Sequence, residues 1–113
     1  MTTPKGKRRP AAKESTSVAH KPRLLGWLKD PRNAAAYLET AFEEDDVEGL
    51  MQAIRNVAEA QGGVARVAER AGLSRETLYR TLSKLGNPQV KSLAAILEAT
   101  GLRLAVKPLK RAA

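Results

Sequence analysis

Residues 64–83, VARVAERAGLSRETLYRTLS, constrain the fold more than any other part of this chain. Small, glycine and apolar residues occur there at the positions that two closely crossed helices require. Ala68 leaves room for a second helix to pass over the first, and Gly72 supplies a left-handed turn residue. Ser74 can cap the second helix, and Leu78 and Leu82 can anchor that helix in a core. The segment therefore predicts two short helices joined by a tight turn.

Helical patterns also precede this pair. Asp30 before Pro31 predicts an N-cap and a first helical residue, with a helix over residues 32–44. Its expected apolar stripe is Ala35, Leu38, Ala41 and Phe42. Asp46 can cap a second helix. The apolar face of that helix is expected to be Val47, Leu50, Met51, Ile54, Val57 and Ala58.

Glycines and a period change define the remaining elements. Gly62 and Gly63 end the second helix, and three shorter helices are expected over residues 64–70, 74–84 and 89–100. After Gly101 the apolar residues alternate, which predicts a short strand over residues 102–107. The predicted fold class is all-α, with five helices and one short C-terminal β-strand.

A lone strand would leave backbone N–H and C=O groups without partners. The economical partner is the same strand of a second copy, which predicts a homodimer through Leu102, Leu104 and Val106. The edge of a sheet in a different protein could compete for the same strand. The pattern does not choose between these two partners.

The ends of the chain differ from its middle in composition. Residues 1–23 hold seven Lys or Arg and one Glu, so they carry +6 of the net charge of +8. This composition predicts a disordered basic tail over 1–23, a globular domain over 24–109 and a short tail over 110–113. The basic tail could be a phosphate-binding arm or a solubilising extension.

The composition excludes several classes of function. The chain has no cysteine and one histidine, His20, so it predicts no disulfide, no metal site and no cofactor. No nucleophile–base pair or glycine-rich phosphate loop is present, so an enzyme is not expected. Apolar runs are far shorter than the roughly 20 residues that span a bilayer, and we expect a cytoplasmic protein without a membrane partner.

Residues 64–83 resemble the helix-turn-helix of the phage Cro and repressor family, although Val64 stands where that family often has a glutamine. In such a unit the second helix enters the major groove of DNA. The polar face of this helix predicts base contacts from Arg75, Glu76 and Arg80. Contacts with the DNA backbone are predicted for Ser74, Thr77, Lys84, Asn87 and Lys91. The alternative is a merely solvated helix face.

At a larger scale, residues 30–107 resemble the antidote family of type II toxin–antitoxin modules, of the HigA type. The resemblance rests on Tyr37-Leu38-Glu39, Gly72-Leu73-Ser74-Arg75, Tyr79-Arg80-x-Leu82-Ser83 and Gly86-Asn87-Pro88. It implies an antitoxin that neutralises a RelE/ParE-like toxin and represses its own operon at double-stranded operator DNA. The edge of the toxin's sheet could then compete for the strand over residues 102–107. A stand-alone regulator and a nonspecific nucleic-acid-coating protein are the alternatives.

An acidic run completes the set of candidate residues. Residues 39–48 contain six carboxylates and no Lys or Arg, which could steer a small basic toxin toward this part of the surface. The predicted toxin-facing residues are Glu39, Glu43, Glu44 and Asp45. A solvated junction between two helices is the alternative interpretation of the run.

Overall fold

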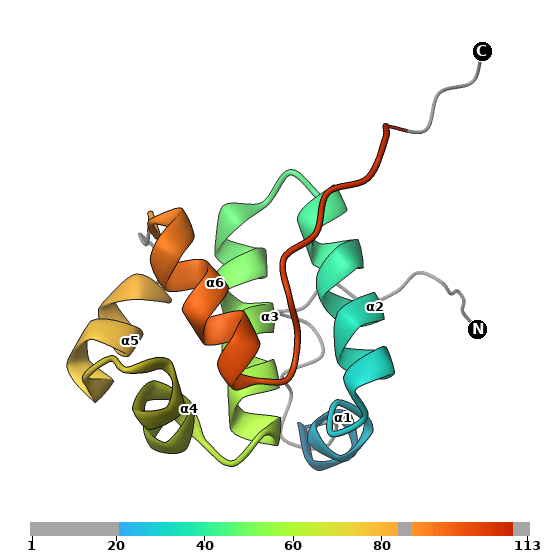
Figure 1. Cartoon of the computed structure of the whole chain (residues 1–113). Helices are drawn as coiled ribbons and strands as arrows, with labels where there is room; N and C mark the ends of the chain where they lie inside the picture. Colours follow the sequence, from blue (N-terminus) through green and yellow to red (C-terminus); the bar gives the residue numbers. More distant parts are fainter. Residues whose placement is uncertain (1–20, 84–86, 110–113) are drawn as a thin grey trace.

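The computed structural model describes residues 21–83 and 87–109 of the 113-residue chain, and within these ranges it contains six helices and no strand. The helices are α1 (Lys21–Trp27), α2 (Pro31–Glu43), α3 (Val47–Ala60), α4 (Val64–Ala71), α5 (Arg75–Thr81) and α6 (Val90–Ala99). Residues 102–109, here called the C-terminal segment, leave α6 and run beside α2 (Figure 1). The predicted all-helical class is confirmed.

The first helix was not predicted. α1 begins at Lys21, so residues 21–23, which their charge assigned to the tail, are helical. Lys21 Nζ forms an ion pair with Glu59 Oε1 of α3 at 3.0 Å, and Leu28 after α1 is fully buried. The rest of the predicted basic tail, residues 1–20, and residues 110–113 lie outside the described residues.

The predicted caps of α2 and α3 are both confirmed. The Arg32 N–H donates to Asp30 Oδ1 at 2.9 Å, and Pro31 occupies the first position of α2, where a missing N–H costs nothing. The Gly49 N–H donates to Asp46 Oδ1 at 3.1 Å at the start of α3. These side chains satisfy N–H groups that have no partner within a helix.

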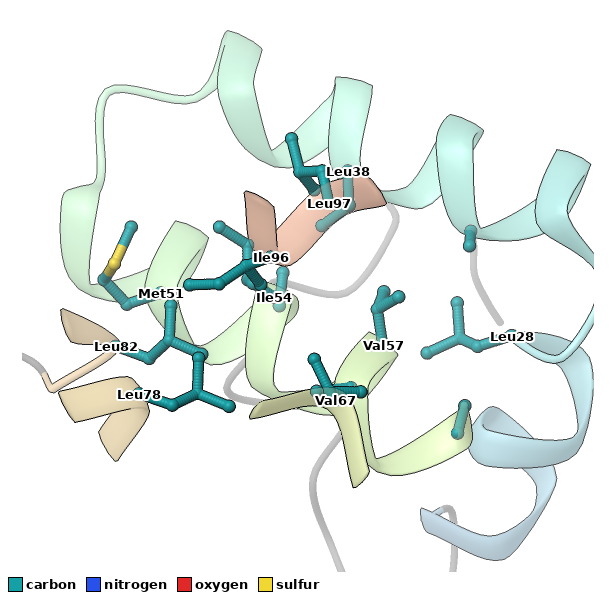
Figure 2. Packing of buried hydrophobic residues seen from close by; sticks show 14 of the residues in the cluster. Leu28, Leu38, Met51, Ile54, Val57, Val67, Leu78, Leu82, Ile96 and Leu97 are labelled. Carbon is teal, nitrogen blue, oxygen red and sulfur yellow. The ribbon is translucent and has the colours of Figure 1, made fainter. Parts of the chain in front are cut away.

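The core is formed where α3 packs against α1, α2 and α4 and where α4 packs against α5 and α6. Figure 2 shows side chains from these helices converging, and the largest that are buried are Leu28, Met51, Ile54, Val57, Val67, Leu78, Leu82 and Ile96. The polar side chain of Asn56 is also fully buried. Its amide nitrogen donates to the Tyr37 hydroxyl at 2.9 Å, and its oxygen accepts from Gln52 at 3.1 Å.

Two details of the apolar pattern differ from prediction. α2 buries Ala34, Leu38 and Ala41, whereas Phe42 is 46% exposed. The buried face is therefore rotated toward Ala34 relative to the predicted stripe. Val47 is 58% exposed because it is the first residue of α3, beside the turn, where no helix covers it.

The predicted strand over residues 102–107 is absent from the described chain. The Leu102 N–H donates to Leu97 O at 2.9 Å, which closes the end of α6. Residues 103–109 make no backbone–backbone hydrogen bond with another described residue. A strand is defined by its pairing, and the described part of a single chain offers this segment no partner.

Candidate nucleic-acid interface

The turn between α4 and α5 has the geometry that its residues predict. α4 ends at Ala71 and is followed by Gly72, whose φ of 74° and ψ of 26° are left-handed; the Leu73 N–H then donates to Ala68 O at 2.9 Å. Ala68 is 1% exposed, and Leu73 is partly buried against the core. Glycine adopts this backbone conformation without the cost that a Cβ brings. The turn therefore fixes the direction in which α5 leaves α4.

Ser74 sets the start of α5. Its Oγ accepts a hydrogen bond from the Thr77 N–H at 2.9 Å and donates one to Thr77 Oγ1 at 2.8 Å. Ser74 therefore caps the helix, as predicted, and its hydroxyl is already engaged with Thr77.

α5 divides its residues between the core and solvent. Leu78 on α5 and Leu82 directly after it are fully buried. Four side chains on the other side of the helix are exposed: Arg75, Glu76, Tyr79 and Arg80. The structure thus brings the three predicted base-reading residues together on one short exposed helix face.

Most of the residues predicted to contact the DNA backbone lie in the described ranges. α5 ends at Thr81 rather than at residue 84, and Lys84 lies outside the described residues. Asn87 is exposed, and Lys91 is exposed in the first turn of α6. Thr77 is partly buried. α5 is therefore shorter than the sequence predicted. After the helix, the Ser83 N–H donates to Arg80 O at 3.3 Å.

Two arginines that sequence reasoning missed hold these helices in place. Arg55 Nη1, from α3, donates to Leu82 O at 2.7 Å at the end of α5, and Nη2 donates to Gln52 Oε1 at 2.5 Å. Arg70 Nη1 donates to the carbonyls of Gln61 at 3.1 Å and Ala99 at 3.2 Å. Neither arginine belongs to an apolar pattern, so helical periodicity does not single it out.

Two of the predicted toxin-facing residues, Glu39 and Glu43, line one groove together with the C-terminal segment. Glu39, Glu43, Glu44 and Asp45 are all exposed. Lys107 Nζ lies 3.7 Å from Glu39 Oε2, and a groove of about 620 Å³ separates α2 from the segment. Figure 1 shows α2 and the segment on a different side of α3 and α6 from α5. The two candidate surfaces are therefore distinct.

Other kinds of site find no support in the described ranges. No group of three or more His, Cys, Asp or Glu side chains there could hold a metal ion. None of the helices in those ranges is both long and apolar enough to cross a membrane.

Comparison with known proteins identifies the family. Residues 21–108 match the model of a family described as "Probable addiction module antidote protein". Over 71 residues the chain is 34% identical to an uncharacterized protein of Haemophilus influenzae, and the alignment covers 63% of this chain and 72% of that protein. No solved structure matches the chain. Since the family match spans α1 to the C-terminal segment, this chain belongs to the family of probable addiction module antidote proteins.

Proposed function

We propose that this protein is a non-catalytic antitoxin that binds its own operator DNA through α4 and α5, represses its operon and neutralises a toxin. The observation that carries the DNA-binding half is the division of α5. Leu78 is fully buried, and next to it Arg75 and Arg80 extend into solvent. Family membership supports the toxin-neutralising half.

The DNA contacts follow from the chemistry of the exposed face. Arginine side chains can donate two hydrogen bonds to guanine O6 and N7, which suits Arg75 and Arg80, and Glu76 can accept from cytosine N4. Ser74, Thr77, Lys84, Asn87 and Lys91 are the proposed contacts with phosphates. Ser74 and Thr77 are hydrogen-bonded to each other at the N-terminus of α5. Their contribution to phosphate binding is therefore to orient the start of α5 toward the backbone of the DNA.

The proposed toxin is a small basic protein of the RelE/ParE type. Its contact surface on this chain is the acidic end of α2, formed by Glu39, Glu43, Glu44 and Asp45. α2 has no basic residue in its last turn, so the negative end of its dipole adds to these carboxylates. A cationic partner relieves the repulsion among these carboxylates and the negative end of the helix dipole. Long-range attraction to the same charges raises the association rate of that partner.

The proposed assembly in the cytoplasm is a homodimer. Two copies related by a two-fold axis present two α5 helices, so the operator is an inverted repeat. The half-site centres are expected about 34 Å apart, or a multiple of that distance.

Selection of bound duplexes from a random DNA pool tests the DNA-binding half. We expect an inverted repeat to emerge and the Arg80→Ala variant to bind it about 1–3 kcal/mol more weakly, with a much smaller loss on random DNA. Arg32→Ala is the matched control, because Arg32 lies on α2 and its side chain is 92% exposed. Equal losses on selected and random DNA would reduce Arg80 to a phosphate contact.

Co-expression with the product of the neighbouring reading frame tests the other half. An antitoxin restores the growth that the neighbouring product arrests. If the DNA selection yields an inverted repeat but the neighbouring product does not arrest growth, the protein is instead a stand-alone regulator.

A further inference from the structure

Polar side chains of α2 and α3 form a continuous series of hydrogen bonds that ends directly after α5. Arg55 Nη1 donates to Leu82 O at 2.7 Å, and Arg55 Nη2 donates to Gln52 Oε1 at 2.5 Å. The Gln52 amide nitrogen donates to Asn56 Oδ1 at 3.1 Å, and the Asn56 amide nitrogen donates to the Tyr37 hydroxyl at 2.9 Å. We call the side chains of Tyr37, Asn56, Gln52 and Arg55 the polar relay. The relay connects α2, through α3, to the end of the helix proposed to enter DNA.

We propose that the polar relay positions α5 for the recognition of DNA. Arg55 contacts the end of α5 directly, and Gln52 and Asn56 act on α5 through Arg55. The inference deepens the proposed function, on which it rests for the binding of DNA by α5. It gives these three side chains of α3 a role in the affinity for operator DNA, although none of them belongs to α5.

The two ends of α5 are held in different ways. At its start, the turn at Gly72 and the Ser74 cap join it to α4, against which it packs. At its other end, the Leu82 side chain is fully buried and the Leu82 carbonyl accepts from Arg55. The last carbonyls of a helix lack partners within the helix and carry the negative end of its dipole, so a guanidinium suits this position. Arg55 therefore ties the far end of α5 to α3.

The chemistry of the relay fixes the direction of each of its bonds. A guanidinium has donors only, so Gln52 must turn its oxygen toward Arg55 and its NH2 group toward Asn56. Asn56 then accepts with its oxygen, which leaves its NH2 group for the Tyr37 hydroxyl. Turning over either amide would bring two donors together. The position of the Arg55 guanidinium therefore depends on a series of bonds that begins on α2.

Burial makes this arrangement specific. Asn56 is fully buried, and a buried amide costs free energy unless its groups are hydrogen-bonded. Apolar side chains of the same shape can replace a hydrogen-bonded pair at little cost, so stability alone does not require an amide here. A fully satisfied buried network favours one geometry over its alternatives. Side chains that recognise a ligand need to be held within about 0.5 Å of their working position, and α5 carries three of them: Arg75, Glu76 and Arg80.

Hydrogen exchange of the free protein tests the relay without DNA. Asn56→Leu and Gln52→Met each replace an amide by an apolar side chain of similar size. We expect the Leu82 N–H, which donates to the last turn of α5, to exchange about threefold to tenfold faster in both variants. The reason is that a less constrained Arg55 holds the end of α5 less firmly. Gln52 is only partly buried, so Gln52→Met keeps the test valid if Asn56→Leu fails to fold.

Two references make the exchange measurement specific. The Leu73 N–H lies in the turn before α5, where the relay makes no contact, and should keep its exchange rate in both variants. Asn33→Leu is the matched control, because it removes an asparagine hydrogen bond of 2.9 Å, to Trp27 O, outside the relay. It should leave the Leu82 N–H unchanged. Equal acceleration at Leu73 and Leu82, or the same effect from Asn33→Leu, would overturn the inference.

Binding to the selected duplex tests the role on DNA. At a temperature where each variant is fully folded, Asn56→Leu and Gln52→Met should each bind the selected duplex roughly threefold to tenfold more weakly. Their affinity for random DNA should change less than about twofold, because contacts with phosphates tolerate a small shift of α5 better than contacts with base edges do. A residue that only stabilised the fold would leave both affinities unchanged in fully folded protein.

A double-mutant cycle tests whether Asn56 acts through Arg55. In an Arg55→Met background, the further change Asn56→Leu should weaken binding to the selected duplex by less than about twofold, because the side chain that transmits its effect is gone. If the effects of the two substitutions simply multiply, Asn56 does not act through Arg55, and the inference is wrong.

The two kinds of measurement separate this inference from the proposed function. If no duplex is selected, but Asn56→Leu speeds exchange at Leu82, the proposed function fails while the control of α5 by the relay stands. If an inverted repeat is selected and both relay variants bind it with the affinity of the natural chain, the proposed function stands and the inference is rejected.

Discussion

The α4–α5 pair and the C-terminal segment differ in how far contacts within the chain satisfy their backbone groups and bury their side chains. In the pair, the turn is closed by the bond from the Leu73 N–H to Ala68 O, α5 is capped by Ser74, and Leu78 fills the core. The C-terminal segment has no such closure in the described chain beyond Leu102, and it ends with Val106 and Leu109 largely exposed. The residues of the pair satisfy one another, whereas most of the segment has no backbone–backbone hydrogen bond in the described chain and exposes apolar side chains.

This difference indicates where each kind of function resides. A rigid, capped helix can present side chains in fixed positions, which recognition of base edges requires. An extended segment with unpaired backbone can join a sheet with any chain of suitable pattern. Substitutions in the pair should therefore change the stability of the monomer, whereas those in the segment should change assembly.

The largest effect is expected for Leu78→Ala. Leu78 is fully buried between α5 and the core, so removing its methyl groups loses apolar burial and leaves a cavity. We expect the free energy of unfolding to fall by about 2–5 kcal/mol in urea titration. Val106→Ala is the control from the other region and should change monomer stability by less than about 0.5 kcal/mol, because Val106 is fully exposed. Similar losses in the two variants would remove the contrast between the regions.

A smaller loss is expected for Arg55→Met, which keeps the apolar stem of the side chain and removes its donors. The Leu82 carbonyl would lose the charged donor that lies 2.7 Å away. Hydrogen bonds to charged groups contribute about 1.5–3 kcal/mol, and partial burial places this one near the lower end of that range. Thermal unfolding of Arg55→Met should show this loss, whereas Arg32→Met on exposed α2 should not. An unchanged melting temperature in Arg55→Met would mean that water replaces the guanidinium.

Gly72→Ala should cost about 1–2 kcal/mol through the backbone alone. No atom lies within 4 Å of a Cβ added at Gly72, so the cost comes from the φ of +74°. Gly26 in α1 is a matched control, because a Cβ there is also free of contacts and its φ is not positive. Gly26→Ala should stabilise the protein by up to about 1 kcal/mol, since alanine favours helix. If both substitutions changed stability in the same direction, backbone strain at residue 72 would not explain the effect of Gly72→Ala.

The two regions also differ in how far the sequence could predict them. Ser74, Asp46 and Asp30 act through neighbours two or three residues away, so their caps are visible in the sequence and are confirmed in the structure. The exposure of Arg75 and Arg80 likewise followed from the inward positions of the leucines around them.

The failures have a common physical origin in contacts that are distant in sequence. The three consecutive alanines 34–36 do not fix which side of α2 is buried, and packing against α3 turned Ala34 inward. Arg55 reaches across 27 residues to Leu82, which no local pattern encodes. α1 was missed because its first residues share the basic composition of the preceding tail. The strand over residues 102–107 was predicted from alternation alone, without the partner that would define it.

The smallest effect on stability is expected for proline at residue 104 or 105, which nonetheless tests assembly. Successive N–H groups of an extended strand point to opposite sides, so only one of these two residues can donate to a paired segment. Neither N–H donates to backbone in the described chain, and both residues are exposed. Leu104→Pro and Ala105→Pro should therefore each retain helicity, with stability changes below about 0.5 kcal/mol at dilute concentration. In sedimentation and operator-binding measurements, at least one of the two variants should become monomeric and bind the inverted repeat more weakly, because it lacks a ladder hydrogen bond.

If both variants remain dimeric and bind at wild-type affinity, the segment does not pair, and the dimer must form through the helices. A large loss of helicity in either variant would show that the segment supports the fold of the monomer, contrary to the contrast between the two regions.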